Sequence, residues 1–260
     1  MRRRAFWALF GLGFVGVLGI IPTLVQLLRS KPLPPEAPKL PFGAIVALSL
    51  VQPTLLLAAG VAIGLRLAPR LGLRSHVVER LGGGPAVWPA VRREAPLAAA
   101  IGLAQMAVTL LLDLAFKPVM GAAWRRLEEG EDPMGGPVTG LIAGLLYGGI
   151  TEELMLRWGV MSLLAWLVWR LGGGGAEARP RASVLWAAVV ASALLFGLGH
   201  LPAVSSLVPL TPVIATRTVL LNAIAGVGFG WLFWRRSLEA AMIAHAASHV
   251  VLFVARLVTP

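Results

Sequence analysis

Three charged residues interrupt one apolar segment of the chain: Glu152, Glu153 and Arg157. A charge in the middle of a membrane costs about 2.5 to 3.5 kcal/mol on insertion scales, so such residues usually have a function. In a helix, Glu153 and Arg157 are spaced i, i+4 and can pair, whereas Glu152 points about 100° away. A carboxylate without a partner in a poorly solvated cavity is an effective base for hydrolysis. The structural alternative is that both acids form ion pairs between helices that only fix the packing.

Three of the four histidines also lie in apolar segments or at their ends: His200, His245 and His249. One buried histidine is usually a hydrogen-bonded core residue, but three beside two carboxylates favour a site. His245 and His249 are spaced i, i+4, which suits two metal ligands on a helix and equally two residues that line one pocket. The fourth, His76, lies in an arginine-rich loop, where we expect it to be solvated.

The other polar residues of the apolar segments are expected to be structural. Asn222 could donate to a developing oxyanion, but a hydrogen bond between two helices is favoured. Asp113 and Lys117 have the spacing of a further helical ion pair. Gly148 and Gly149 precede Glu152 by one turn, and their missing side chains would admit a close helix, a substrate backbone or water.

Composition predicts which elements position these residues. The 260 residues are 57% hydrophobic and 13% charged, and the mean hydropathy is +0.80, far from the values of soluble domains. The net charge of +11 comes from arginines grouped between apolar runs, which favours contact with anionic lipid headgroups over nucleic acid. Without cysteine, disulfides and thiolate chemistry are excluded, and a metal would need His and carboxylate ligands.

Seven apolar runs have about the length that crosses a bilayer, so we expect an all-α polytopic bundle of seven or eight transmembrane helices. The run at 137–170 is the exception, because 34 helical residues would reach about 51 Å against a core of about 30 Å. This helix must therefore tilt strongly, project from the membrane or break. The first run is interpreted as a retained span rather than a signal peptide. The runs are 5–28, 42–67, 97–116, 137–170, 183–199, 215–234 and 238–257.

The arginines predict the orientation. If the run at 137–170 crosses once, the arginines of the N-terminus and of the later loops fall on one side of the membrane, which should be the cytoplasm. We expect the N-terminus and the loop at 68–96 to be cytoplasmic, and the protein to be a multi-pass protein of the cell inner membrane. The arginines in question are Arg2 to Arg4, Arg66, Arg70, Arg74, Arg80, Arg92, Arg93, Arg179, Arg181, Arg235 and Arg236.

The positions of His245 and His200 along their helices determine whether they can share one site. His245 lies about 10 Å from the cytoplasmic start of its helix, whereas His200 lies about 25 Å along its own run, so straight helices would keep them apart. We expect the helix that carries His200 to be tilted or to begin outside the membrane, and the irregular backbone after it, with Pro202 and Pro209, to dip into a cavity. We also expect Glu152, His200 and His245 to converge on one water, in a cavity that opens to the cytoplasmic half of the bilayer.

The motifs resemble those of the CPBP family of intramembrane proteases, also called the ABI family, which includes the type II CAAX prenyl endopeptidases. The resemblance rests on three motifs in order: Glu152-Glu153-x-x-x-Arg157, Phe196-x-x-x-His200, and His245 followed four residues later by a polar side chain. It covers about residues 137 to 255. It implies two regions, an N-terminal set of transmembrane helices at 1–136 and a catalytic region at 137–260.

The resemblance also implies roles for the site residues. Glu152 and His200 would activate a water, Glu153 and Arg157 would hold the helix in place, and His245 would help to bind the oxyanion. His249 stands where the family usually has Asn or Asp; it can donate a hydrogen bond but could also favour a metal. The family is read as a metal-independent, glutamate-type protease more often than as a metalloenzyme, so no cofactor is expected, and a divalent metal at His200, His245 and His249 is left open.

The function expected from these features is endopeptidase activity within the membrane. The substrate would be a lipidated or membrane-associated peptide or protein, the other partners would be membrane lipids, and the oligomeric state is left open. One alternative is a non-catalytic scaffold or a bacteriocin-immunity-type protein that binds a peptide without cutting it. The other is a transporter that uses Glu152 and the histidines as a proton relay, which would predict an internal repeat that the sequence lacks.

Overall fold

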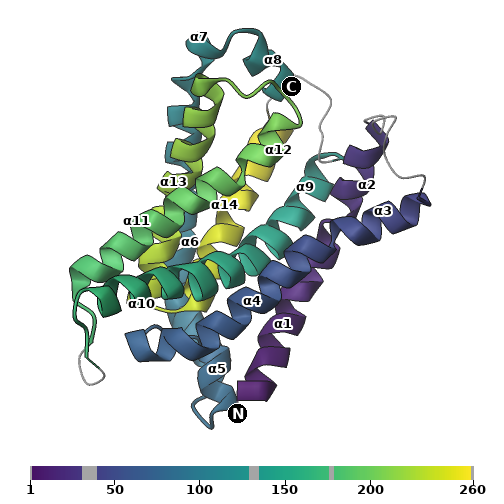
Figure 1. Cartoon of the computed structure of the whole chain (residues 1–260). Coiled ribbons are helices and arrows are strands. Elements are labelled where there is room, and N and C mark those ends of the chain that lie inside the picture. The colour runs from purple at the N-terminus through teal and green to yellow at the C-terminus, as the bar shows by residue number, and fades with distance from the viewer. Residues whose placement is uncertain (1, 31–39, 129–134, 176–178, 259–260) are drawn as a thin grey trace.

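The computed structural model describes residues 2–30, 40–128, 135–175 and 179–258, and all regular structure in these ranges is helical. Seven of the helices, or runs of consecutive helices, are long and apolar enough to cross a membrane. The prediction of an all-α polytopic bundle is therefore confirmed. Figure 1 shows long helices that run obliquely past one another between two ends of the bundle.

The N-terminal half supplies three of these spans. The first comprises α1 and α2, the second comprises α3, α4 and the 3₁₀ turn η1, and the third is α6; the short helices α5, α7 and α8 connect or follow them. The bounds are α1 Arg2–Gly19, α2 Ile21–Ser30, α3 Phe42–Ser49, α4 Val51–Leu67, η1 Ala68–Leu71, α5 His76–Leu81, α6 Val87–Leu114, α7 Lys117–Met120 and α8 Ala122–Glu128.

The C-terminal half supplies the other four. One long helix comprises α9, η2, η3 and α10, the next span comprises α11 and α12, and the last two are α13 and α14. The bounds are α9 Pro137–Ala143, η2 Gly144–Glu152, η3 Leu154–Met161, α10 Ser162–Leu171, α11 Ala182–Gly199, α12 Leu201–Ser205, α13 Pro212–Arg235 and α14 Leu238–Val258.

The long helix that carries Glu152 and Glu153 does not break. It runs from Pro137 to Leu171, and its middle, η2 and η3, is π-helical, with i→i+5 hydrogen bonds in place of i→i+4. A wider turn rises less per residue, so the helix is shorter than an α-helix with the same number of residues. It also lies obliquely in the bundle (Figure 1). Tilt and π-turns together explain how so long a run can be a single span.

The π-helical middle lies at the centre of the bundle. It packs against α1 and α4 on one side and against α11, α13 and α14 on the other. Glycines allow the close approach: Gly16 of α1 lies against the backbone of Leu146, and Gly60 of α4 lies against Met155. Thr151 donates a hydrogen bond to the carbonyl of Gly13 at 2.7 Å. The helix with the two carboxylates is therefore enclosed on several sides by packed helices.

The arginine-rich segments lie at one end of the bundle. Figure 1 shows the N-terminus beside α5, with α7, α8 and α12 at the opposite end. The turn between α13 and α14 lies at the same end as α5, because the amide of Leu238 donates to the carbonyl of Arg74 at 3.0 Å. The fold thus gathers these arginines on one side, as the single crossing at 137–170 predicts.

Cysteine labelling tests which side this end faces. The chain has no cysteine, so single cysteines at the exposed residues Arg92 and Ser30 would be the only targets of a membrane-impermeant maleimide. Arginines favour the cytoplasmic side, so we expect Arg92→Cys to react from the cytoplasm and Ser30→Cys from outside. Ser75 is unsuitable for labelling, because it is only 1% exposed and caps α5. The reverse pattern of labelling would invert the orientation.

Candidate active site

The ion pair expected within the long helix is present. Arg157 Nη1 lies 3.1 Å from Glu153 Oε1, and both side chains are fully buried. Arg157 also donates through Nη2 to the carbonyl of Gly226 in α13 at 3.1 Å. Its guanidinium lies over the rings of Phe196 and Phe229, at 4.8 and 5.3 Å from their centroids, which suits a cation in an apolar site. Arg157 therefore joins the long helix to both α11 and α13.

Glu153 has a second partner that the spacing along one helix does not predict. His245 of α14 places Nδ1 2.8 Å from Glu153 Oε1. Because a carboxylate accepts, Nδ1 is the nitrogen that carries the proton, and the other nitrogen, Nε2, faces Glu152. The imidazole is 3% exposed and lies parallel to the ring of Phe229, with centroids 4.5 Å apart. Glu153 and Phe229 together fix both the tautomer and the orientation of His245.

Glu152 lies in a different environment from its neighbour. Its side chain is 16% exposed, and its Oε2 lies 3.8 Å from His245 Nε2, which is too long for a hydrogen bond. No described side chain donates to it within hydrogen-bond distance, and Arg157 contacts Glu153 instead. Glu153 is thus buried and held through Oε1 by two partners, whereas Glu152 is partly open beside an imidazole nitrogen.

His200 is joined to this group through an aromatic ring. Its Nδ1 lies 2.8 Å from the carbonyl of Phe196, and a carbonyl can only accept, so Nε2 is left free as an acceptor. The Phe196 ring makes edge-to-face contacts with His200 at 4.7 Å and with His245 at 5.7 Å between centroids. The structure therefore places the two imidazoles against the same aromatic ring. The oblique course of α11 in Figure 1 is the tilt that this proximity requires.

The chain after His200 is irregular, as expected, only at 206–211, because the short helix α12 comes first. α12 continues the helix from Leu201 to Ser205, and the amide of Val204 donates to the carbonyl of His200 at 3.1 Å. Pro202 lies in the first turn of α12, where a proline needs no amide donor. Pro202 and Pro209 are both exposed rather than drawn into the protein.

His249 and the glycines of the long helix fit one another. His249 stacks on His245 with the centroids 5.1 Å apart and the planes 16° apart. A methyl group on Gly144 would collide with the ring of His249, and one on Gly148 would meet both imidazoles. Gly149 lies against Ala246 in the same way. Of the three occupants that the glycines allow, the structure has the close helix, α14.

The histidines that the structure describes are not grouped as metal ligands. Among the described residues, no group of three or more His, Cys, Asp or Glu side chains is arranged to hold a metal ion. His245 and His249 are stacked face to face. No step of the hydrolysis proposed below passes through a metal.

Two predictions about polar pairs are wrong. Asn222 does not bridge helices, because its amide donates to the carbonyl of Thr218 one turn earlier in α13. Asp113 does not pair with Lys117; it accepts two hydrogen bonds from Arg217 of α13, each 2.5 Å long. Arg217 is the residue that sequence reasoning overlooked, although a lone arginine within an apolar run calls for a buried acid.

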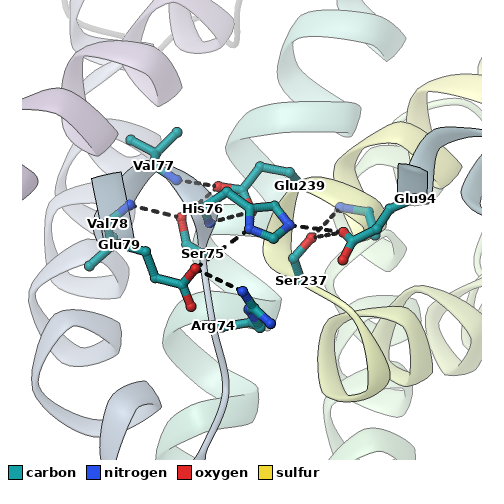
Figure 2. A network of polar contacts seen from close by, with 10 residues as sticks. Arg74, Ser75, His76, Val77, Val78, Glu79, Glu94, Ser237 and Glu239 are labelled. Carbon is teal, nitrogen blue, oxygen red and sulfur yellow. Dashed lines mark hydrogen bonds and ion pairs between the residues drawn. The ribbon is translucent and has the colours of Figure 1, made fainter. Parts of the chain in front are cut away.

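His76 is not solvated either. It is 4% exposed, and its Nε2 lies 3.1 Å from Glu94 while its Nδ1 lies 3.6 Å from Glu79 (Figure 2). Its backbone amide donates to Glu239 of α14 at 3.0 Å. Arginines surround His76 in the sequence, but the acids that bury it come from three different helices, so the local composition was misleading.

One comparison with known proteins gives a match. Residues 135–251 match the family model described as type II CAAX prenyl endopeptidase Rce1-like. The matched region contains all six predicted site residues, from Glu152 to His249, and it agrees with the family that the three motifs indicate. No curated protein and no solved structure matches the chain.

Proposed function

We propose that this protein hydrolyses a peptide bond with a water activated by Glu152. Its residues 135–251 match the Rce1-like family of type II CAAX prenyl endopeptidases. The proposal rests on the different surroundings of two adjacent carboxylates. Glu153 is buried against Arg157 and His245, whereas Glu152 is partly open and unpaired. Two carboxylates with different surroundings can take different roles, one as a base and one as a support.

In this mechanism Glu152 accepts a proton from water as the water oxygen attacks the carbonyl carbon of the substrate. His200 supports the step, because its free Nε2 can accept the second hydrogen of the same water and so orient it. Attack forms a tetrahedral intermediate with a negative oxygen. The proton is then held on Glu152, next to His245 Nε2.

His245 carries the second half of the reaction. Because Nδ1 donates to Glu153, Nε2 has no proton in the neutral imidazole and can accept the one held by Glu152. The imidazolium can then donate toward the oxyanion and deliver the proton to the leaving amine. Glu153 stabilises this positive charge, as a carboxylate behind a catalytic histidine does. The water supplies the hydroxyl of the new acid and the proton of the new amine.

The location of the site favours a substrate that is itself in the membrane. Glu152, His200 and His245 all belong to helices that are long and apolar enough to span a bilayer. A soluble peptide would lose hydration on entering such a site, whereas a lipidated or membrane-embedded segment is already in the apolar phase. We therefore expect a membrane-associated peptide or protein that is cut close to its lipid anchor or membrane segment.

Three matched strains test the function: one with the wild-type protein, one with Glu152→Gln, and one without the gene. Quantitative proteomics of their membranes should show the same uncut peptide accumulating in the Glu152→Gln and gene-free strains. The substitution removes the base but keeps the shape of the side chain. A peptide that changes only in the gene-free strain would instead indicate a non-catalytic scaffold and would contradict the proposal.

A further inference from the structure

A cavity of about 320 Å³ lies at the arginine-rich end of the bundle and includes none of the residues of the candidate active site. Its walls come from three segments: the turn before α5, the first turns of α6 and the turn between α13 and α14. These segments lie at the same end as the N-terminus (Figure 1). The lining residues that matter here are Arg74, His76, Arg93, Glu94, Leu97 and Arg236.

Two of the three arginines in this cavity are free to bind a ligand. Arg93 and Arg236 are exposed, and neither guanidinium forms an ion pair with a residue that the structure describes. Arg74 is shared, because its Nη2 lies 2.9 Å from Glu79. Guanidinium groups bind phosphate with two parallel hydrogen bonds, so three of them around one space suit a phosphate group.

The acid in the cavity wall does not cancel this charge. The same oxygen of Glu94, Oε2, lies 3.1 Å from His76 Nε2 and accepts a hydrogen bond from the hydroxyl of Ser237. Glu94 is thereby held by the wall itself and is not directed at Arg93 or Arg236. The cavity as a whole keeps an excess of positive charge.

A network of hydrogen bonds frames the cavity. Glu239 of α14 accepts from the hydroxyl of Ser75 at 2.6 Å and from the backbone amides of His76 and Val77 at 3.0 Å each. Figure 2 shows how this network joins the start of α5 to Glu94 of α6 and to Ser237 before α14. The segments that carry the arginines are therefore fixed before any ligand arrives, which lowers the entropic cost of binding.

The depth of the cavity matches the surface of a bilayer. In α6, Arg92, Arg93 and Glu94 are followed by a stretch from Ala95 to Leu112 without any charged residue. The cavity therefore lies where the helix passes from the polar interface into the apolar core. Leu97 lines it and is 38% exposed, so it offers an apolar surface directly below the arginines. Arginines above and an apolar wall below fit a lipid headgroup with its acyl chains.

We propose that this cavity binds the phosphate of an anionic phospholipid headgroup, with Arg93 and Arg236 as its principal ligands and Arg74 beside them. The lipid comes from the cytoplasmic leaflet if the arginine-rich end faces the cytoplasm. Binding joins α6 to the turn that leads into α14, at a place separate from Glu152 and His245. The proposal is independent of the hydrolytic activity.

Lipid titration of the purified full-length protein tests the site. The protein in a neutral detergent is titrated with phosphatidylglycerol, with phosphatidylcholine and with inorganic phosphate, and the unfolding temperature and the lipids retained in native mass spectra are measured. A ligand that binds only the folded state raises the unfolding temperature. We expect phosphatidylglycerol to bind and stabilise the wild type, and the other two to have little effect.

The decisive comparison is between two double variants with the same change of charge. Arg93→Gln with Arg236→Gln removes the cavity arginines, and Arg92→Gln with Arg235→Gln removes exposed neighbours that do not line it. A basic side chain near an anionic surface contributes roughly fivefold, so the first variant should bind phosphatidylglycerol about 25-fold more weakly and the second almost as the wild type. If both double variants bound phosphatidylglycerol equally weakly, general surface charge would explain the binding, and the proposed site would be wrong. Equal protection by inorganic phosphate would overturn its assignment to a lipid.

Discussion

The purified Glu152→Gln protein is expected to cleave its substrate about 10² to 10⁴ times more slowly than the wild type, because general bases typically contribute rate factors of that size. Its unfolding temperature should be unchanged. Glu152 is partly exposed and takes part in no close ion pair, since its nearest cationic or imidazole partner, His245 Nε2, is 3.8 Å away. An amide of the same shape therefore removes little packing and leaves no buried charge behind.

Asp113→Asn provides the matched control for this result. It also neutralises one carboxylate in a membrane-spanning helix, but Asp113 binds Arg217 and lies outside the candidate site. We expect this variant to lose stability and to keep its rate per folded molecule. If Glu152→Gln retained the wild-type rate, or if the control lost the same rate factor, the base would have to be another group.

Glu153→Gln and Arg157→Leu, unlike Glu152→Gln, should lose stability, by about 3 to 5 kcal/mol in the free energy of unfolding. Each variant leaves a fully buried charge without its partner. Glu153→Gln also removes the carboxylate that holds His245 Nδ1, so its remaining folded fraction should cleave slowly as well. Denaturant unfolding in detergent, followed by tryptophan fluorescence, measures the loss of stability, and a cleavage assay normalised to the folded fraction measures the rate.

The double variant Glu153→Gln with Arg157→Leu distinguishes an ion pair from two separate contributions. Removing both charges leaves no uncompensated ion, so the double variant should be destabilised by less than the sum of the two single changes. Additive losses would show that the residues act independently. A stability loss in Glu152→Gln as large as in Glu153→Gln would contradict the division of roles between the two carboxylates.

The sequence was most informative at charged residues within apolar runs, because a charge in the membrane costs free energy. Seven apolar runs and the pair of Glu153 with Arg157 could be predicted because both follow from spacing within one segment and from the cost of a charge in the membrane. The same reasoning applied to Asp113 chose the nearest cation along the helix and missed Arg217, which lies 104 residues away. Contacts between helices depend on the packing, which local spacing does not contain.

The geometry around His245 shows the same limit. Its spacing from His249 was visible, but the bond to Glu153 arises only because glycines let α14 approach the long helix. His76 was misjudged because its partners Glu94 and Glu239 come from other helices. The π-helical turns could not be predicted from the sequence either. A buried helix is apolar on all sides, so its sequence has no periodicity that would distinguish a π-turn from an α-turn.

The π-helical turns also affect how this protein should be aligned with its relatives. Each wide turn takes up more residues than an α-turn, so a relative with a plain α-helix at this place needs a gap inside a membrane span, where alignments ordinarily allow none. An alignment without that gap is one residue out of register on one side of the turn. Glu152 and Glu153 are adjacent in the sequence. A register error of one residue would therefore assign the role of the base to Glu153, the carboxylate that is buried in the ion pair.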